Sequence, residues 1–255
     1  MSSSEPAAPA ALPRAVGILG AGRAGTGVAR AIARIPRLSP GLPEVRALVA
    51  GTRRPSAVQR HLTVYAPAAQ AVAAEELAAR AEVIVVAVPR EDLDDVDPLA
   101  LAGPGVRAVV DMTNTWGEEL LPAWLEAGHD DAPGTARIAA RWAAAGLEVP
   151  VVRALSEVSH HDLDVHGRAA APRRALAVGT MPAADASDPG ADASDPGAVV
   201  AARDAVAALV TAMGFDAVPY EGLERAAVLE PGGAGFGVAH DARELAALLG
   251  AGPRG

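Results

Sequence analysis

The chain has 255 residues, of which 51% are hydrophobic, and a formal net charge of −9. This length suits one large α/β domain or a domain with a small appendage, and the acidic charge argues against a nucleic-acid partner. No apolar run reaches the roughly 20 residues that cross a bilayer, and residues 1–13 lack the pattern of a signal peptide. We therefore expect a disordered tail over residues 1–13 and a cytoplasmic protein without membrane partners.

Two residue types are missing from the chain, and both absences narrow the chemistry. There is no Cys, which excludes thiolate nucleophiles and cysteine metal sites. There is also no Lys, since all 22 basic residues are Arg, which excludes Schiff-base catalysis and the P-loop lysine.

Strand and helix patterns alternate through the first 158 residues. Short apolar runs predict buried strands, and apolar residues at helical spacing predict the helices between them. This alternation favours a doubly wound, mostly parallel α/β sheet, which we assign to residues 14–158. In order we expect a strand at 15–20, a helix at 23–35 ending at Pro36, a strand at 44–51, a helix at 56–66 capped by Ser56, a helix at 74–81, a strand at 82–89, an acidic helical segment at 90–102, a strand at 107–114, a helix at 134–146 and a strand from 149.

Residues 159–255 predict a C-terminal α/β extension with a different pattern. The sequence DASDPGA occurs twice in succession, and its Asp-Pro-Gly turns predict a mobile solvent loop at 185–198. Around it we expect a strand at 173–180, a helix at 198–213, a strand at 214–220, a helix at 223–230 and a last helix at 241–250.

A glycine motif stands between the first expected strand and the first expected helix. The residues Gly20-Ala21-Gly22-Arg23-Ala24-Gly25 match G-x-G-x-x-G in the place where a dinucleotide-binding fold requires it. Gly20 would allow a tight turn, Gly22 would let a pyrophosphate approach the backbone, and Gly25 would let the helix pack closely. The start of the helix, which includes Arg23 and Ala24, would supply N–H groups and a positive dipole to the phosphates.

The end of the second expected strand favours NADP(H) over NAD(H). A fold that binds NAD usually places Asp or Glu there to hold a ribose hydroxyl. This chain instead offers Thr52, Arg53 and Arg54, a hydroxyl and two guanidinium groups suited to a 2′-phosphate. The alternative is that both Arg side chains are solvated loop charges.

Taken together, the segments GILGAGRAG, AGTRRPSA, EVIVVAVP, VVDMTN, VPVVRAL and LVTAMGFDAVPYEGLERAAVLEP resemble the coenzyme F420-dependent NADP oxidoreductases. The resemblance extends over roughly residues 14 to 232. It implies a Rossmann fold with a short C-terminal part for the substrate pocket and dimerisation, a homodimer, and hydride transfer between NADP(H) and the deazaflavin F420. It also implies that Ala87, Val88 and Pro89 line the cofactor and that residues 111–114 lie beside the nicotinamide.

Three residues are our candidates for contacting the reacting groups. Thr113 and Asn114 follow an expected strand, and His160 opens the unusual segment HHDLDVH, where it could donate a proton. That segment could equally be a solvated loop, and without a matched pattern of ligands we expect no metal site there. Trp116 lies just past the same strand as Thr113 and could either pack or stack against a substrate ring.

Two other functions stay open at this point. The chain could bind NADP(H) as a sensing module without catalysis, or it could reduce imines in the manner of pyrroline reductases. The second alternative would require a long helical dimerisation domain after residue 160, whereas the sequence there predicts strands.

Overall fold

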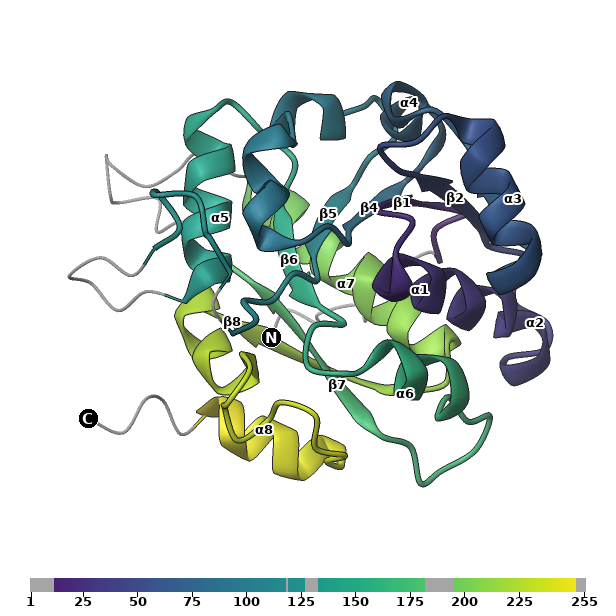
Figure 1. The fold of residues 1–255 in the computed structure, drawn as a ribbon. Helices are drawn as coiled ribbons and strands as arrows, with labels where there is room; N and C mark the ends of the chain where they lie inside the picture. The colour runs from purple at the N-terminus through teal and green to yellow at the C-terminus, as the bar shows by residue number, and fades with distance from the viewer. Residues whose placement is uncertain (1–11, 118, 127–132, 182–194, 251–255) are drawn as a thin grey trace, which may run out of the picture.

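A computed structural model describes residues 12–117, 119–126, 133–181 and 195–250 (Figure 1). Their strands form one sheet in the order β3-β2-β1-β4-β5-β6-β7-β8. This arrangement confirms the predicted α/β Rossmann fold. The tail expected at 1–13 falls outside the described residues up to residue 11, and so does the repeat loop from 185 to 194.

The sheet is parallel from β3 to β6 and changes direction once. β7 pairs antiparallel with β6, and β8 pairs parallel with β7. The six parallel strands therefore end at one edge, with the crevice expected where the chain reverses between β1 and β4. The strands are β1 (Ala15–Leu19), β2 (Arg46–Ala50), β3 (Gln70–Ala71), β4 (Val83–Val86), β5 (Ala108–Asp111), β6 (Val151–Ala154), β7 (Ala175–Thr180) and β8 (Asp216–Glu221).

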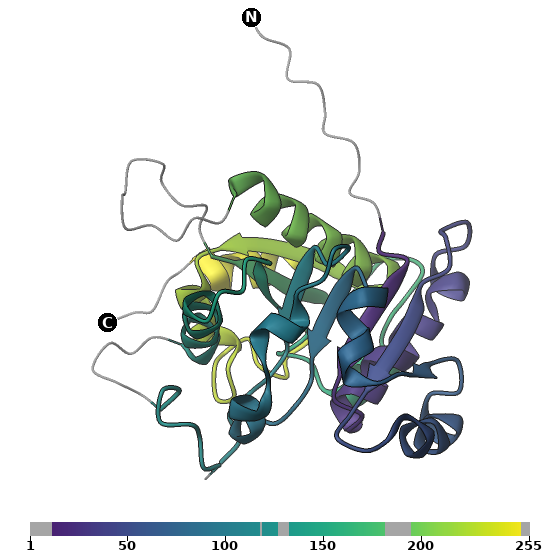
Figure 2. The same ribbon diagram turned by 90° about the horizontal axis from the view of Figure 1, so that it is seen from above.

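Helices cover both faces of this sheet, as the view from above shows (Figure 2). One face is packed by α1 (Arg23–Ala33), α3 (Pro55–Tyr65), α6 (His160–Val165) and α7 (Pro196–Ala212), with the short α2 (Ile35–Leu38) following α1. The other face is packed by α4 (Leu77–Arg80), α5 (Gly134–Ala144), α8 (Ala242–Gly250) and the 3₁₀ helices η2 (Arg90–Asp95), η3 (Pro98–Leu101) and η4 (Leu223–Leu229). A further 3₁₀ helix, η1 (Ala74–Glu76), leads into α4.

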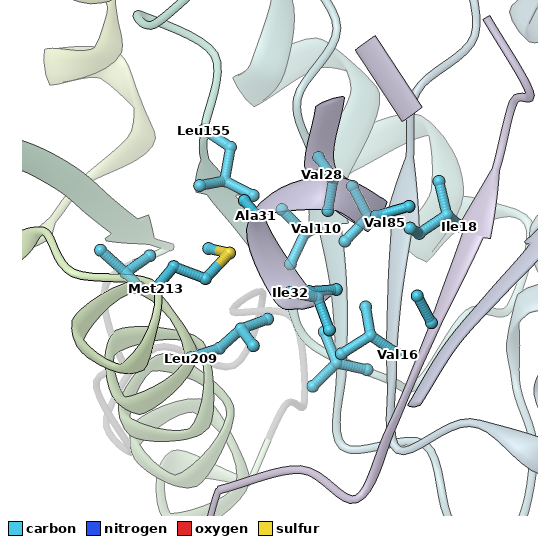
Figure 3. Packing of buried hydrophobic residues seen from close by; sticks show 14 of the residues in the cluster. Val16, Ile18, Val28, Ala31, Ile32, Val85, Val110, Leu155, Leu209 and Met213 are labelled. Atoms are coloured by element: carbon cyan, nitrogen blue, oxygen red, sulfur yellow. The ribbon is translucent and has the colours of Figure 1, made fainter. Parts of the chain in front are cut away.

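The aliphatic core fixes α1 against the strands (Figure 3). Ile32 of α1 is buried between Val16 of β1 and Leu209 of α7, and Val28 of α1 is buried near Val85 of β4. Burying a side chain of this size contributes roughly 1.5–3 kcal/mol relative to its exposure. The packing therefore holds the start of α1, and the glycine turn before it, in a fixed place at the strand ends.

Several expected element boundaries are wrong for identifiable reasons. The first helix ends at Ala33, and Pro36 lies in the first turn of α2, where its missing N–H costs nothing. Residue 54 rather than Ser56 caps α3, because Pro55 takes the favoured first helical position. α7 starts at Pro196, inside the expected loop, because Asp195 caps it by accepting a hydrogen bond from the Gly197 N–H at 2.9 Å.

Other differences concern the type of element. The helical segments expected at 90–102 and 223–230 consist of 3₁₀ helices, η2 and η3 in the first and η4 in the second. The segment after Ser159 is a helix, α6, instead of the solvated loop that we weighed. Ser159 starts it by accepting a hydrogen bond from the Asp162 N–H at 3.0 Å, and Leu163 is buried in the core.

Candidate active site

A cleft of about 630 Å³ opens where β1, β4, β5 and β6 end. Its size is within the range of small-molecule sites in proteins. The loops after these four strands form most of its wall, and the segment before α8 contributes Phe236 and Gly237. The predicted site residues that line it are Gly22, Arg23, Ala24, Ala87, Val88, Pro89, Thr113, Asn114 and His160.

Steric contacts require glycine at two of the three glycine positions of the turn. Gly20 has a φ of +121°, and a Cβ there would collide with the carbonyl oxygen of Ala87. A Cβ on Gly25 would collide with the carbonyl oxygen of Gly20, so this glycine closes the turn onto the helix. A Cβ on Gly22 would meet nothing within 4 Å. No steric contact therefore requires glycine at position 22, and Gly22 leaves open space at the start of α1.

The start of α1 is suited to bind an anion. Gly22 takes the N-cap position and offers no side chain to the backbone N–H groups of the first turn. The first helical hydrogen bond runs from the Thr26 N–H to the Gly22 carbonyl at 3.0 Å. The N–H groups that precede it point out of the helix without an intrahelical acceptor, at the positive end of the helix dipole.

The loop after β2 lies next to this turn. A Cβ on Gly51 would lie 3.2 Å from the Cβ of Ala21. The next three residues, Thr52, Arg53 and Arg54, are exposed and do not line the cleft itself. Within the described part of the chain, neither guanidinium makes a hydrogen bond or an ion pair. The Arg53 and Arg54 side chains, two guanidinium groups without a partner among the described residues, therefore lie beside the glycine turn.

A buried ionic network lies under the other end of the cleft. Asp111, at the end of β5, is fully buried, and its Oδ2 accepts hydrogen bonds from Thr135 at 2.7 Å and from Arg153 at 3.1 Å. Its Oδ1 accepts hydrogen bonds from the backbone N–H and the hydroxyl of Thr113. Burial opposes ionisation of this carboxyl, but the charges of Arg153 and Arg90 hold its pKa below the ordinary value.

Arg90 extends this network to the C-terminal segment. Its guanidinium is 2% exposed and makes a two-pronged pair with Glu230, at 2.9 and 3.0 Å. It also donates to the hydroxyls of Thr113 at 3.1 Å and Thr115 at 3.0 Å. Gly134 makes room for it, because a Cβ there would collide with the guanidinium. Arg90 therefore joins the loop after β5 to the residue that follows η4.

Sequence reasoning missed Arg90, Arg153 and Glu230. One signal was available, because Arg153 stands inside an apolar strand where a buried charge needs a partner. Asp111 ends another such strand, and the two strands pair so that Asp111 and Arg153 are opposite each other. No sequence pattern indicated Glu230, which lies far along the chain.

The network engages two of our three candidate catalytic residues. The Thr113 hydroxyl donates to Asp111 and accepts from Arg90. The Asn114 amide accepts a hydrogen bond from Arg153 at 2.8 Å and donates one to the Ser156 carbonyl at 2.7 Å. Both residues thus form a fixed part of the cleft floor.

His160 lies on the opposite wall, at the first position of α6 and against Gly27 of α1. Its side chain is exposed. No hydrogen bond of its ring is found among the residues that the structure describes, so the ring is available to a ligand.

The turn after β6 is irregular. Leu155 has a φ of +64°, which is uncommon for a residue other than glycine, Asn or Asp. After it, Oε1 of Glu157 accepts a hydrogen bond from the Ala177 N–H at 2.6 Å, so this carboxyl takes the place of a strand carbonyl where β6 leaves β7. Glu157 is 2% exposed, and burial raises the pKa of its carboxyl.

Two features are absent from the described residues. None of the helices there is long and apolar enough to cross a membrane. No group of three or more His, Asp or Glu side chains in these residues is arranged to hold a metal ion.

Comparison with known proteins shows what this chain is similar to. Solved structures share the fold over most of the chain. One is a hypothetical protein, SMa0349, from Sinorhizobium meliloti, with 19% identity, a TM-score of 0.63, and coverage of 89% of this chain and 95% of that one. Another is a candidate F420-dependent NADP-reductase from Arthrobacter sp. FB24, with 22% identity, a TM-score of 0.57, and coverage of 88% and 99%.

No curated protein sequence gives a significant match. The family model described as NADP oxidoreductase coenzyme F420-dependent matches residues 15–115, which contain the glycine turn, the loop after β2 and the ends of β4 and β5. By sequence, residues 15–115 are therefore similar to the coenzyme F420-dependent NADP oxidoreductases.

Proposed function

We propose that the protein binds NADP(H) along the strand ends and transfers hydride between it and a second redox compound. The observation that carries this proposal is the pairing of an anion-binding helix start with two unpaired arginines beside it. The glycine turn would hold the pyrophosphate, and Arg53 and Arg54 would hold the 2′-phosphate. NADPH, when bound, supplies the hydride.

The cleft suits this cofactor because it leaves backbone groups available to the phosphates. Gly22 presents bare backbone, and the first-turn N–H groups of α1 have no acceptor within the helix. At the other end, Thr113 and Asn114 are held still by the ionic network, so the floor there can orient a ring with little reorganisation. His160 is the group that could deliver a proton to the acceptor.

For the acceptor we propose the deazaflavin coenzyme F420. The support is the description of the family whose model matches residues 15–115. The same resemblance leads us to propose a homodimer, and we separately propose that the protein works in the cytoplasm.

Arg53→Ala tests the cofactor assignment. Loss of a charge-assisted hydrogen bond should weaken NADPH binding by about 1–3 kcal/mol and leave NADH affinity nearly unchanged. Arg60→Ala, which removes another exposed arginine from α3, is the matched control. Equal losses for both nucleotides, measured by fluorescence titration, would refute a 2′-phosphate site.

A sensing module is the second candidate, and one observation favours it. The polar atoms of Thr113 and Asn114 are already engaged in the network and offer little chemistry to a substrate. Mixing the protein and NADPH with deazaflavin, flavins and cyclic imines, and following the nicotinamide absorbance, separates the two functions. Tight NADPH binding without oxidation by any acceptor would favour the sensor.

A further inference from the structure

Two aromatic rings meet at the cleft, and both come from outside the segment that the family model matches. Trp116 and Phe236 line the cleft with their ring centroids 5.5 Å apart and their planes at 71°. Trp116 is 53% exposed, so much of its ring surface has no protein partner. The chain has only two Phe and three Trp, and one of each lies here.

The segment that carries Phe236, residues 231–237, is anchored at both ends, and we call it the strap. At its start, Glu230 pairs with Arg90. At its end, the Gly237 N–H donates to the Glu157 carbonyl at 2.9 Å, and Arg174 donates to the Val238 carbonyl at 3.1 Å. Phe236 is the only large side chain between Pro231 and these last anchors.

The loop that carries Trp116 is held by the same arginine. Arg90 donates to the hydroxyl of Thr115, the residue before Trp116, and the Trp116 N–H donates to Glu119 at 3.0 Å. One buried guanidinium therefore contacts both segments that bring the rings together. Its fork shape lets it hold a carboxylate and a hydroxyl at once, which a lysine could not do in the same geometry.

We propose that Trp116 and Phe236 select the hydride acceptor by stacking against the flat face of a conjugated fused ring, and that Arg90 and Glu230 are positioning residues for this pair. The inference rests on the proposed function and deepens it, because it names the part of the acceptor that the protein recognises, its fused ring system. Aromatic side chains attract a ring offset-stacked or edge-on, and a saturated or single small ring offers much less contact area. Small cyclic imines should accordingly be poor acceptors.

The first test measures binding without turnover. The protein is saturated with NADP⁺, and 5-deazariboflavin is titrated against the wild type, Trp116→Ala and Phe236→Ala. Each variant should weaken deazaflavin binding roughly three- to tenfold, the range of an aromatic pair, and change NADP⁺ affinity less than twofold. Tyr65→Ala is the control, since Tyr65 is also 53% exposed and contacts one other ring but does not line the cleft.

The second test concerns the positioning residues. Glu230→Gln keeps the volume of the side chain and removes its charge, which should weaken deazaflavin binding about as much as Phe236→Ala. The double variant Glu230→Gln/Phe236→Ala should lose no more deazaflavin affinity than either single variant, because both substitutions act through the Phe236 ring. A merely structural role for Glu230 would instead lower deazaflavin and NADP⁺ affinity by the same factor, with additive losses in the Glu230→Gln/Phe236→Ala double variant, whether or not the unfolding midpoint falls.

The outcomes separate this inference from the proposed function. Unchanged deazaflavin affinity in both ring variants, or no binding to the wild type, overturns the inference even if some acceptor oxidises NADPH. Loss of deazaflavin binding in both ring variants supports it, even if no acceptor oxidises NADPH and the proposed activity falls. Efficient turnover of 1-pyrroline with the ring variants unaffected would also overturn it.

Discussion

The two ends of the cleft use the same side chain in opposite ways. Beside the glycine turn, Arg53 and Arg54 are exposed and make no ion pair within the described residues. Under the other end, Arg90 and Arg153 are buried and share the carboxylate of Glu230, and Arg153 also pairs with Asp111. Because all basic residues of the chain are Arg, residue type alone does not separate ligand-binding cations from structural ones. The partners of each guanidinium decide whether it is free for a ligand or part of the folded network.

The difference has an energetic basis. An exposed arginine without a partner keeps its hydration and can exchange it for a phosphate at little cost to folding. A buried arginine that loses its carboxylate is left as an uncompensated charge in the interior. Substitutions at the first end should therefore change binding, and substitutions at the second end should change stability.

The largest expected effect comes from Asp111→Ala. It leaves Arg153, which is fully buried, with Glu230 at 3.4 Å as its remaining charged hydrogen-bond partner. Breaking a buried pair from one side costs about 3–5 kcal/mol of unfolding free energy. Urea unfolding of the variant measures this, with Asp92→Ala, an exposed acid on η2, as the control. A loss below about 1 kcal/mol would mean that the network is not a scaffold.

The same comparison explains what the sequence could and could not predict. The fold, the glycine turn and the cleft-lining loops followed from local patterns, because strand ends and turn glycines leave signals within a few residues. The ionic network depends on Glu230 meeting Arg90 across 140 positions, and no local pattern encodes such a contact. α6 was uncertain for a different reason, since its six residues are too few to show a helical period.

Within the glycine turn, one substitution should affect NADPH binding and another should affect stability. Gly22→Ala should leave the unfolding free energy nearly unchanged, because its Cβ would meet open space, yet weaken NADPH binding by at least about tenfold, or ~1.4 kcal/mol. Gly25→Ala should instead destabilise the fold by roughly 1–3 kcal/mol, because its Cβ collides with the Gly20 carbonyl. Chemical unfolding and NADPH titration of both variants measure the two effects.

A reversed pattern, with Gly22→Ala unfolding the protein and Gly25→Ala affecting only NADPH, would show that the open space at Gly22 is not a phosphate seat.

The smallest effect concerns Glu157, whose Oε2 is buried without a hydrogen-bond partner among the described residues. Burial raises its pKa above the ordinary value of 4.5, so the folded state holds this proton more tightly than the unfolded state does. Its contribution to stability is therefore complete below about pH 4.5 and is lost as the pH rises through the raised value.

Glu157→Gln keeps an oxygen to accept the Ala177 N–H and cannot titrate. The variant should gain unfolding free energy relative to the wild type as the pH rises, by no more than about 1.4 kcal/mol per pH unit. Urea unfolding between pH 4 and 8 measures this difference. If it stays constant over that range, the pKa of the Glu157 carboxyl is the same in the folded and unfolded states, and the charges of Arg153 and Arg174 then offset the effect of burial in full.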